Sequence, residues 1–354
     1  MTYRIAVYGT GNVGKQALRG VIAHPDLQLC AVLVSAAEKI GRDAADLADL
    51  TAPTGVTATA DVDAVLAAEP DCVVYAAATD DRLEAALADQ VNLLRHGVNV
   101  VASGPVFLQF PYGVVPDELF APIAEAADAG RASILVNGID PGFANDLLPL
   151  ALTGTCARVD QVRCMEIVNY ATYDSATVLF DVMGFGKPLD DVPLLLQPGV
   201  LSMAWGSVVR QIANALGLRL DHVEEVHERD VATADISTSC GIVPAGTAAA
   251  LHFEVRGIAD GKIRIVLEHF TRLHDDLRPD WPQPAGAGGS YRIEVEGEPR
   301  YALDLVPHSH LGDHNHAALV GTAMRLVNAA PAVITAAPGL LTARDLPLIP
   351  GWAR

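Results

Sequence analysis

Three glycines near the beginning of the sequence have the spacing of a phosphate-binding turn. Gly9, Gly11 and Gly14 form the pattern G-x-G-x-x-G, which follows the apolar segment Arg4–Tyr8 and opens the helical segment Gly14–His24. In such a turn the first glycine permits a tight bend, the second lets the backbone approach a pyrophosphate, and the third permits close helix–strand packing. This context favours a dinucleotide site at a helix N-terminus over a turn that is merely tight. The expected cofactor contacts are Gly9, Thr10, Gly11, Asn12, Val13, Gly14 and Ala77.

The residues after the second apolar segment bear on which dinucleotide is bound. NAD sites usually carry an acidic residue at the end of the second strand, where it holds the ribose 2′-hydroxyl. Here that segment ends at Ser35, and Lys39 and Arg42 follow it. A hydroxyl with two cations suits a 2′-phosphate, although both cations could instead be solvated charges at the start of the next helix. We therefore expect NADP as the cofactor, with NAD as the alternative.

Asp140 is a candidate catalytic residue because of its position. It follows the apolar segment Ser133–Asn137, and open α/β sheets bind their ligands beyond the ends of such strands. Its carboxyl group could act as a general acid or as the counter-ion of a substrate amine. The alternative is a structural role, in which Asp140 caps the turn that continues into Pro141 and Gly142.

A histidine-rich segment precedes the last helical stretch. Its spacing does not reproduce H-E-x-x-H or another metal signature, so we expect no metal there. We expect it to border the active site or to cap the helix, with Asp313 or Asn315 as the N-cap. His310 or His314 could donate a proton to a carbonyl oxygen. The segment contains His308, His310, Asp313, His314 and His316.

Residues 1–140 alternate short apolar segments with helical patterns, which predicts a Rossmann-type, doubly wound parallel sheet. The predicted strands are Arg4–Tyr8, Leu29–Val34, Asp71–Ala77, Val98–Ala102 and Ser133–Asn137. The predicted helices are Gly14–His24, Asp61–Ala68, Arg82–His96 and Glu118–Gly130.

The pattern changes after residue 140. Alternation of apolar and polar residues predicts a mainly antiparallel sheet, with one helix over Val200–Gly217, in an α+β domain. The predicted strands are Arg158–Tyr170, Ala248–Gly257, Lys262–Leu273 and Tyr291–Val295. We expect a dinucleotide-binding domain at 1–140 and a substrate and dimerisation domain at 141–315. The C-terminal helix and tail, 316–354, are expected to return to the first domain.

Composition excludes several classes of function. The chain of 354 residues is 51% hydrophobic and carries a formal net charge of −19, which argues against nucleic acid and anionic membranes as partners. The five cysteines are far apart and form no C-x-x-C, which indicates neither disulfides nor a zinc site. No secretory pattern opens the sequence and no apolar run reaches the length of a spanning helix. We therefore expect a cytoplasmic protein that acts on a small molecule.

Several longer segments, in this order, carry a resemblance to one family. They are RIAVYGTGNVGKQALRGVIAHPDLQL, EKIGRDAADL, NGIDPGFANDLLPLAL, YATYDSATVLFDVMGFGKP and GTAMRLVNAAPAVITAAPGLLTARDLP. Together they resemble the native amine dehydrogenases and 2,4-diaminopentanoate dehydrogenases, whose N-terminal domain is similar to that of dihydrodipicolinate reductase. The resemblance implies a homodimeric, NAD(P)-dependent oxidoreductase that interconverts a ketone or aldehyde, ammonia and an amine. It also implies a substrate pocket lined by Phe143, Tyr170 and Tyr173. The Tyr173 phenol could donate a proton there, and the alternative for these rings is ordinary core packing.

The chain departs from this family at one point. The family's amine dehydrogenases carry a glutamate after the fourth strand that binds ammonia and moves its protons. The corresponding stretch here, residues 102–111, has no carboxylate, and Val106 or Pro105 stands at that position of the pocket. Ammonium must lose a proton before it attacks a carbonyl, so another group would have to act. Glu166 could supply the carboxylate if it faces the cofactor.

Three functions therefore stay open at the level of the sequence. The first is reductive amination, in which NAD(P)H reduces the C=N bond formed from a small ketone or aldehyde and ammonia or an amine. The second is carbonyl reduction or preformed-imine reduction without ammonia activation, which the missing glutamate favours. The third is a non-catalytic NAD(P)-binding regulatory protein.

Overall fold

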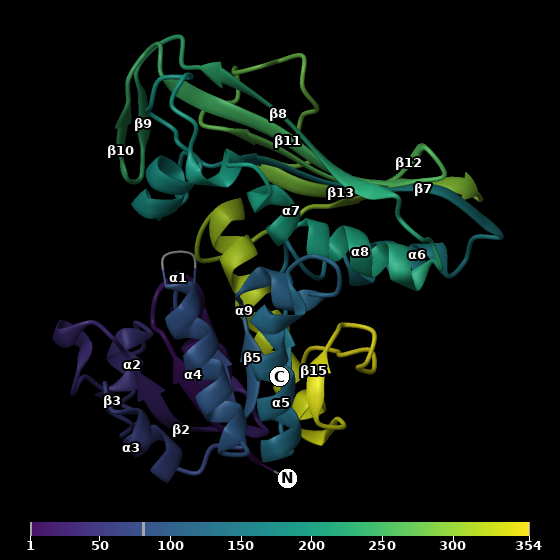
Figure 1. The fold of residues 1–354 in the computed structure, drawn as a ribbon. Coiled ribbons are helices and arrows are strands. Elements are labelled where there is room, and N and C mark those ends of the chain that lie inside the picture. The colour runs from purple at the N-terminus through teal and green to yellow at the C-terminus, as the bar shows by residue number, and fades with distance from the viewer. Residues whose placement is uncertain (1, 80–81, 354) are drawn as a thin grey trace. The chain divides into compact units, whose positions relative to one another are not determined.

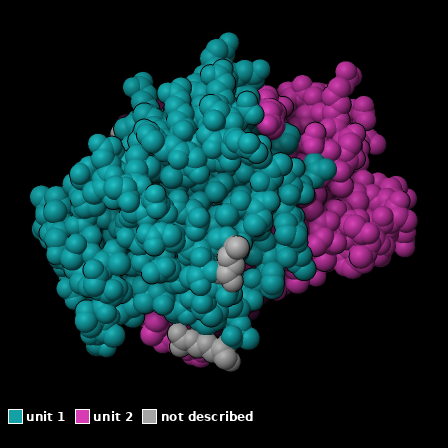
Figure 2. Space-filling view, turned by 90° about the horizontal axis from the view of Figure 1, so that it is seen from below, with its two compact units in different colours: residues 1–111, 115–139, 319–354 teal, residues 112–114, 140–318 magenta. Residues whose placement is uncertain are grey.

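The computed structural model describes residues 2–79 and 82–353 and contains two compact units, which Figure 2 shows in different colours. Unit 1 comprises residues 1–111, 115–139 and 319–354. Unit 2 comprises residues 112–114 and 140–318. The chain thus crosses from unit 1 to unit 2 immediately before Asp140 and returns immediately after Ala318.

Unit 1 is built on a parallel sheet of seven strands in the order β15-β6-β5-β4-β1-β2-β3 (Figure 1). Its strands are β1 (Tyr3–Tyr8), β2 (Leu27–Leu33), β3 (Ala58–Thr59), β4 (Cys72–Tyr75), β5 (Asn99–Ala102), β6 (Ser133–Val136) and β15 (Gly339–Leu341). Strands such as β4 are buried throughout, as expected where helices cover both faces of a parallel sheet. The predicted Rossmann-type fold class is confirmed.

The helices of unit 1 follow the predicted alternation with the strands. They are α1 (Asn12–Ala23), α2 (Ala44–Leu47), α3 (Val62–Ala67), α4 (Leu83–Arg95) and α5 (Asp117–Gly130), with 3-10 turns η1 (Ala37–Lys39) and η2 (Val106–Gln109). The long α9 (His314–Thr335) contributes Leu326, Val327 and Val333 to the core of unit 1. By length and composition, α9 is the one helix in the described part of the chain that could cross a membrane.

Unit 2 contains a mixed sheet in the order β14-β13-β7-β12-β11-β8. Only β7 and β12 pair in parallel, and every other neighbouring pair is antiparallel. Its strands are β7 (Arg158–Asn169), β8 (His222–Val231), β11 (Ala248–Ala259), β12 (Lys262–Arg272), β13 (Gly289–Glu298) and β14 (Tyr301–Leu305), and β9 (Ile236–Thr238) and β10 (Gly241–Val243) form a separate ribbon. The mainly antiparallel second sheet is therefore as predicted.

Helices cover one face of this sheet (Figure 1). They are α6 (Leu147–Thr153), α7 (Val200–Ala204) and α8 (Gly206–Ala215), with the single turns η3 (Thr177–Val182) and η4 (Leu194–Leu196). Val208 and Ile212 of α8 are buried against Phe253 and Leu267 in the core of unit 2. The other face carries ion-paired side chains such as Arg163, Glu254 and Glu268 beside apolar ones such as Ile167 and Phe270.

The prediction of a single helix over Val200–Gly217 is wrong because the structure has two helices there. The structure divides it into α7 and α8, which meet at Trp205. The sequence analysis also did not predict the strands β3, β8, β9, β10, β14 and β15. β8 lies at the edge of its sheet and is rich in charged residues, and β15 has three residues, so neither carries a clear apolar alternation.

Candidate functional site

The glycine-rich turn of unit 1 has the geometry that a dinucleotide requires. Gly9 has φ +91°, and a Cβ atom there would lie 2.6 Å from the Ala77 nitrogen. A Cβ atom on Gly14 would lie 2.0 Å from the Gly9 carbonyl oxygen, so both positions require glycine. At Gly11, by contrast, a Cβ atom would meet nothing within 4 Å. The open space at the N-cap of α1 therefore fits a pyrophosphate.

The cation expected to favour NADP lies against the same turn. The Lys39 ammonium group donates to the Thr10 carbonyl oxygen at 3.1 Å and to the Thr10 hydroxyl at 3.2 Å. Ser35, two residues after the end of β2, and Arg42 are both exposed. Asn12 and Val13 form the first turn of α1, with half-buried side chains.

A buried imidazole lies between two carboxylates in unit 2. His269 on β12 pairs in register with Glu166 on β7, and its Nδ1 lies 3.1 Å from Glu166 Oε2. Its Nε2 lies 3.3 Å from Asp140 Oδ1. The side chains of Asp140, Glu166 and His269 are 4%, 9% and 6% exposed, so the three groups form a charged cluster inside the unit.

Neighbouring groups hold the Asp140 end of this cluster. Asp140 Oδ1 accepts hydrogen bonds from Asn145 Nδ2 at 2.6 Å and from Trp205 Nε1 at 2.9 Å. The His269 ring stacks on Phe253 with centroids 4.5 Å apart, and the Trp205 ring meets it edge-on at 4.7 Å. The break between α7 and α8 thus falls at the residue whose indole contacts both Asp140 and His269.

The two carboxylates determine the charge of His269. Burial alone would lower its pKa, but Asp140 and Glu166 outweigh that effect and raise the pKa from 6.5 to about 10. His269 is therefore an imidazolium at neutral pH. The cluster thus combines one imidazolium with the carboxyl groups of Asp140 and Glu166.

Glu166 also lines a pocket to which three tyrosines contribute. The Tyr170 hydroxyl donates to Glu166 Oε2 at 3.2 Å, and Tyr291, paired with Glu166 across β13 and β7, also hydrogen bonds to it. The Tyr173 ring stacks on the Tyr170 ring with centroids 4.8 Å apart. The full lining is Glu166, Val168, Tyr170, Tyr173, Gly289, Ser290, Tyr291, Pro307, His314, Asn315 and Ala318.

Two of these tyrosines are fixed as hydrogen-bond donors. Burial, and then the negative charge of Glu166, raises the pKa of both the Tyr170 and the Tyr291 hydroxyl well above the usual value. Both phenols therefore keep their protons at neutral pH. The arrangement presents to the pocket a carboxylate that two phenols and one imidazolium hold in place.

The start of α9 forms another part of the pocket wall. His314 Nε2 donates to the Asn169 carbonyl oxygen at 2.6 Å, and Asn315 Nδ2 donates to the same oxygen at 3.1 Å. Asp313 accepts the backbone N–H of His316 at 3.1 Å and so caps α9, as predicted. The histidine-rich segment is thereby joined to the end of β7.

The expected site residues do not all lie in this pocket. Glu166, Tyr170 and Tyr173 line it, and Asp140 belongs to the cluster behind Glu166. Phe143 is half-buried and His310 is exposed, and neither is among the lining residues. Val106 opens η2 in unit 1, with a half-buried side chain. His308 is also exposed, and the His316 ring lies 2.9 Å from the Ser309 hydroxyl.

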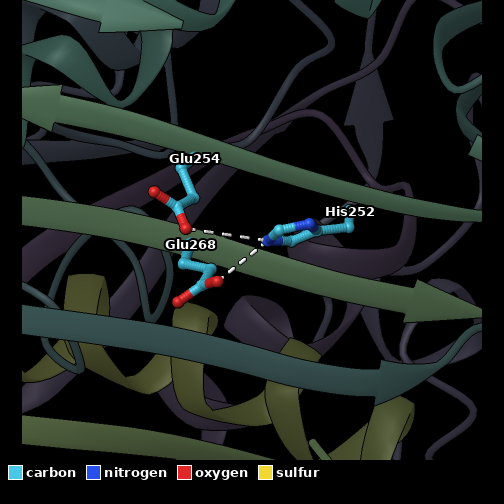
Figure 3. Close-up of side chains that lie close together, drawn as sticks. All are labelled: His252, Glu254 and Glu268. Atoms are coloured by element: carbon cyan, nitrogen blue, oxygen red, sulfur yellow. Dashed lines mark hydrogen bonds and ion pairs between the residues drawn. The ribbon is translucent and has the colours of Figure 1, made fainter. Parts of the chain in front are cut away.

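A second group of metal-ligating residue types lies on the opposite face of the same sheet. Figure 3 shows His252 beside Glu254 and Glu268, with His252 Nε2 2.8 Å from Glu268 Oε1. Arg163 pairs with both glutamates, and Arg256 pairs with Glu254. The guanidinium groups already supply the positive charge that a metal ion would bring, so this group is a largely buried ion-pair network.

Sequence reasoning missed several contributors to the site. Trp205 and Asn145 anchor Asp140, and Tyr291 contacts Glu166 from a strand far away in the sequence. Alternation along β7 and β12 shows which residues of each strand share a face, but it does not identify the neighbouring strands. The signal that the sequence did offer was the alternation of apolar and polar residues. It correctly predicted the two strands that carry Glu166 and His269.

Comparison with known proteins adds the family relationship. Residues 143–353 match the family model of the 2,4-diaminopentanoate dehydrogenase C-terminal domain, and residues 3–97 match that of the dihydrodipicolinate reductase N-terminus. An amine dehydrogenase of Streptomyces virginiae is 42% identical over 98% of this chain and 97% of its own. The 2,4-diaminopentanoate dehydrogenase of Acetoanaerobium sticklandii is 25% identical over 66% of this chain and 64% of its own.

Solved structures support the same fold. The amine dehydrogenase of Mycobacterium smegmatis superimposes with a TM-score of 0.79 at 22% identity, over 99% of this chain and 98% of its own. The matches confirm the resemblance found in the sequence and the expected fold class. They also identify the chain as an NAD(P)-dependent oxidoreductase.

Proposed function

We propose a reaction for this chain, which belongs to the 2,4-diaminopentanoate dehydrogenase C-terminal domain family. The reaction converts a small apolar ketone or aldehyde and ammonia into the corresponding primary amine, and also runs in reverse. The observation that carries this proposal is the Glu166 carboxylate at the wall of a tyrosine-lined pocket. This carboxylate has the chemistry of the family glutamate that residues 102–111 lack. Unit 1 supplies the dinucleotide site and unit 2 supplies the substrate pocket.

The overall reaction needs protons as well as a hydride. A ketone, ammonium, NADPH and one proton give the alkylammonium product, NADP⁺ and water. The bound dinucleotide supplies the hydride, and the residues that would hold it are Gly9, Gly11, Gly14 and Lys39. The protein side chains must remove a proton from ammonium before attack and deliver a proton when water leaves.

Glu166 is suited to the first of these proton transfers. A carboxylate beside aromatic rings attracts an ammonium ion by charge and by cation–π interaction, and it can accept the proton that frees the nitrogen lone pair. The same group, once protonated, can return the proton to the carbinolamine hydroxyl, so that water departs. We assign Tyr173 to the aromatic wall and to a second proton-donating role, and Asp140 to the support of the cluster.

The pocket lining also indicates the class of substrate. Among the lining residues, all within the described part of the chain, there is no lysine or arginine. A substrate carboxylate would therefore find no cationic partner there and would lie near Glu166, which repels it. We infer an amine with an apolar body and no acid group, in contrast to an amino acid.

We assign NADP as the preferred cofactor, because Lys39 lies against Thr10 of the phosphate-binding turn and no acidic residue ends β2. A cation at this place attracts a 2′-phosphate, whereas an acidic residue would repel it.

The test is NADPH oxidation with a panel of apolar ketones and aldehydes, each with and without high ammonium. Turnover that requires ammonium supports the proposal. Equal turnover without ammonium refutes it in favour of carbonyl reduction. Turnover of a preformed cyclic imine, with none from ketone and ammonium together, refutes it in favour of imine reduction. Tight NADPH binding without any turnover refutes it in favour of a regulatory protein.

A further inference from the structure

We infer that His269 is a positioning residue, whose positive charge, anchored by Asp140, orients the Glu166 carboxylate to receive the ammonium group of the substrate. This inference rests on the proposed function and adds to it a residue that is not among the lining residues of the pocket but contacts one of them, Glu166.

The geometry of the contacts carries the first step. Each ring nitrogen of His269 has a carboxylate oxygen within 3.3 Å, Nδ1 that of Glu166 and Nε2 that of Asp140, and the Nε2 contact is an ion pair without hydrogen-bond geometry. Glu166 Oε2 meets both His269 Nδ1 and the Tyr170 hydroxyl. Contacts from two sides restrict rotation of the carboxylate, and such preorganisation raises the efficiency of a catalytic group.

The surroundings show that His269 is held rigidly. Phe253 stacks on one side of its ring and Trp205 meets it edge-on. Asp140, the distal carboxylate, is itself fixed by Asn145 and Trp205. A ring packed in this way has little freedom to rotate, so it acts as a fixed cation and not as a proton shuttle.

The charge balance identifies what the cluster can receive. One imidazolium lies between the carboxyl groups of Asp140 and Glu166, so acidic groups outnumber basic ones among these three side chains. Buried charges are stable when they are paired. An ammonium ion or alkylammonium group next to Glu166 would complete the pairing, whereas an anionic ligand would add to the imbalance. The cluster therefore favours a cationic ligand beside Glu166 over an anionic one.

The experiment compares His269→Gln with the wild-type protein in ketone reduction at varied ammonium concentration. The glutamine keeps a hydrogen-bonding side chain of similar length but removes the charge. We expect the KM for ammonium to rise about tenfold or more, while the KM for NADPH changes by less than about twofold. In a Glu166→Gln background, the second substitution His269→Gln should cause no further rise, because the group that it positions is gone.

His252→Gln is the matched control. His252 lies on the opposite face of the same sheet, also beside glutamates, and touches no residue of the pocket. It should leave the KM for ammonium unchanged. If folded His269→Gln loses thermal stability but keeps the wild-type KM for ammonium, His269 has only a structural role and the inference is overturned. If the wild-type protein turns over without ammonium, the proposed function fails instead, so the two failures are distinguishable.

Discussion

Glu166 on β7 and His269 on β12 are direct neighbours in the one parallel strand pair of the unit 2 sheet, and Glu166 Oε2 lies 3.1 Å from His269 Nδ1. The parallel pairing is what brings them together, because register partners on adjacent strands direct their side chains to the same face. Glu166 lines the pocket and His269 lies behind it. A substitution of Glu166 therefore tests the proton transfer, and a substitution of His269 tests the positioning of Glu166.

Glu166→Gln should reduce ammonium-dependent turnover about 100-fold or more, because the amide cannot accept a proton from ammonium. Cofactor binding, measured by the fluorescence of bound NADPH, should stay as in the wild-type protein. Glu268→Gln is the control, a buried glutamate of β12 on the opposite face that pairs with Arg163. A Glu166→Gln variant with wild-type turnover would remove Glu166 from the mechanism.

The stabilisation that His269 supplies should depend on pH. Its pKa is raised from 6.5 to about 10 in the folded protein, so above pH 6.5 the folded protein holds a proton that the unfolded chain releases. The stabilisation is therefore complete below about pH 6.5 and is lost as the pH rises to about 10. Thermal melts of the wild-type protein and of His269→Gln should show a difference in Tm that narrows over this range. A difference that stays constant, or widens with pH, would contradict the charge assigned to His269.

Lys39→Ala should weaken NADPH more than NADH. The ammonium group beside Thr10 is the charge that we assign to the 2′-phosphate, and a charged hydrogen bond of this kind corresponds to about 10- to 100-fold in affinity. The KM values for both cofactors measure the effect, and Lys262→Ala, in unit 2, is the control. An equal loss for NADPH and NADH would argue against a 2′-phosphate site at Lys39.

Gly11→Ala separates cofactor binding from folding. A Cβ atom at Gly11 meets no atom of the protein within 4 Å, so the variant should fold with a wild-type Tm. If a pyrophosphate occupies that space, the added methyl group should lower dinucleotide affinity about tenfold or more. Gly14→Ala should instead destabilise the fold, because its Cβ would lie 2.0 Å from the Gly9 carbonyl oxygen. Unchanged NADPH affinity in Gly11→Ala would exclude this turn as the binding site.

The sequence alone determined the features that depend on local pattern. Gly9, Gly11 and Gly14 are recognisable because the constraints on a tight turn act within a few residues. The alternation of apolar strands and helices in unit 1 and the alternating strands of unit 2 are local in the same sense. The family resemblance likewise followed from contiguous segments, and the comparisons confirm it.

Only the tertiary structure decided which residues meet in the site. Glu166, His269, Tyr291 and Asp140 come from four separate segments, and their contact depends on strand order and register. Alternation predicts that Glu166 shares a face with Cys164 and Val168, but the period of two does not reveal what covers that face. The break at Trp205 is also tertiary, since the apolar spacing of α7 and α8 continues through it. The sequence alone thus showed that a carboxylate is missing after β5. Only the folded sheet showed that Glu166 lies on the wall of a pocket.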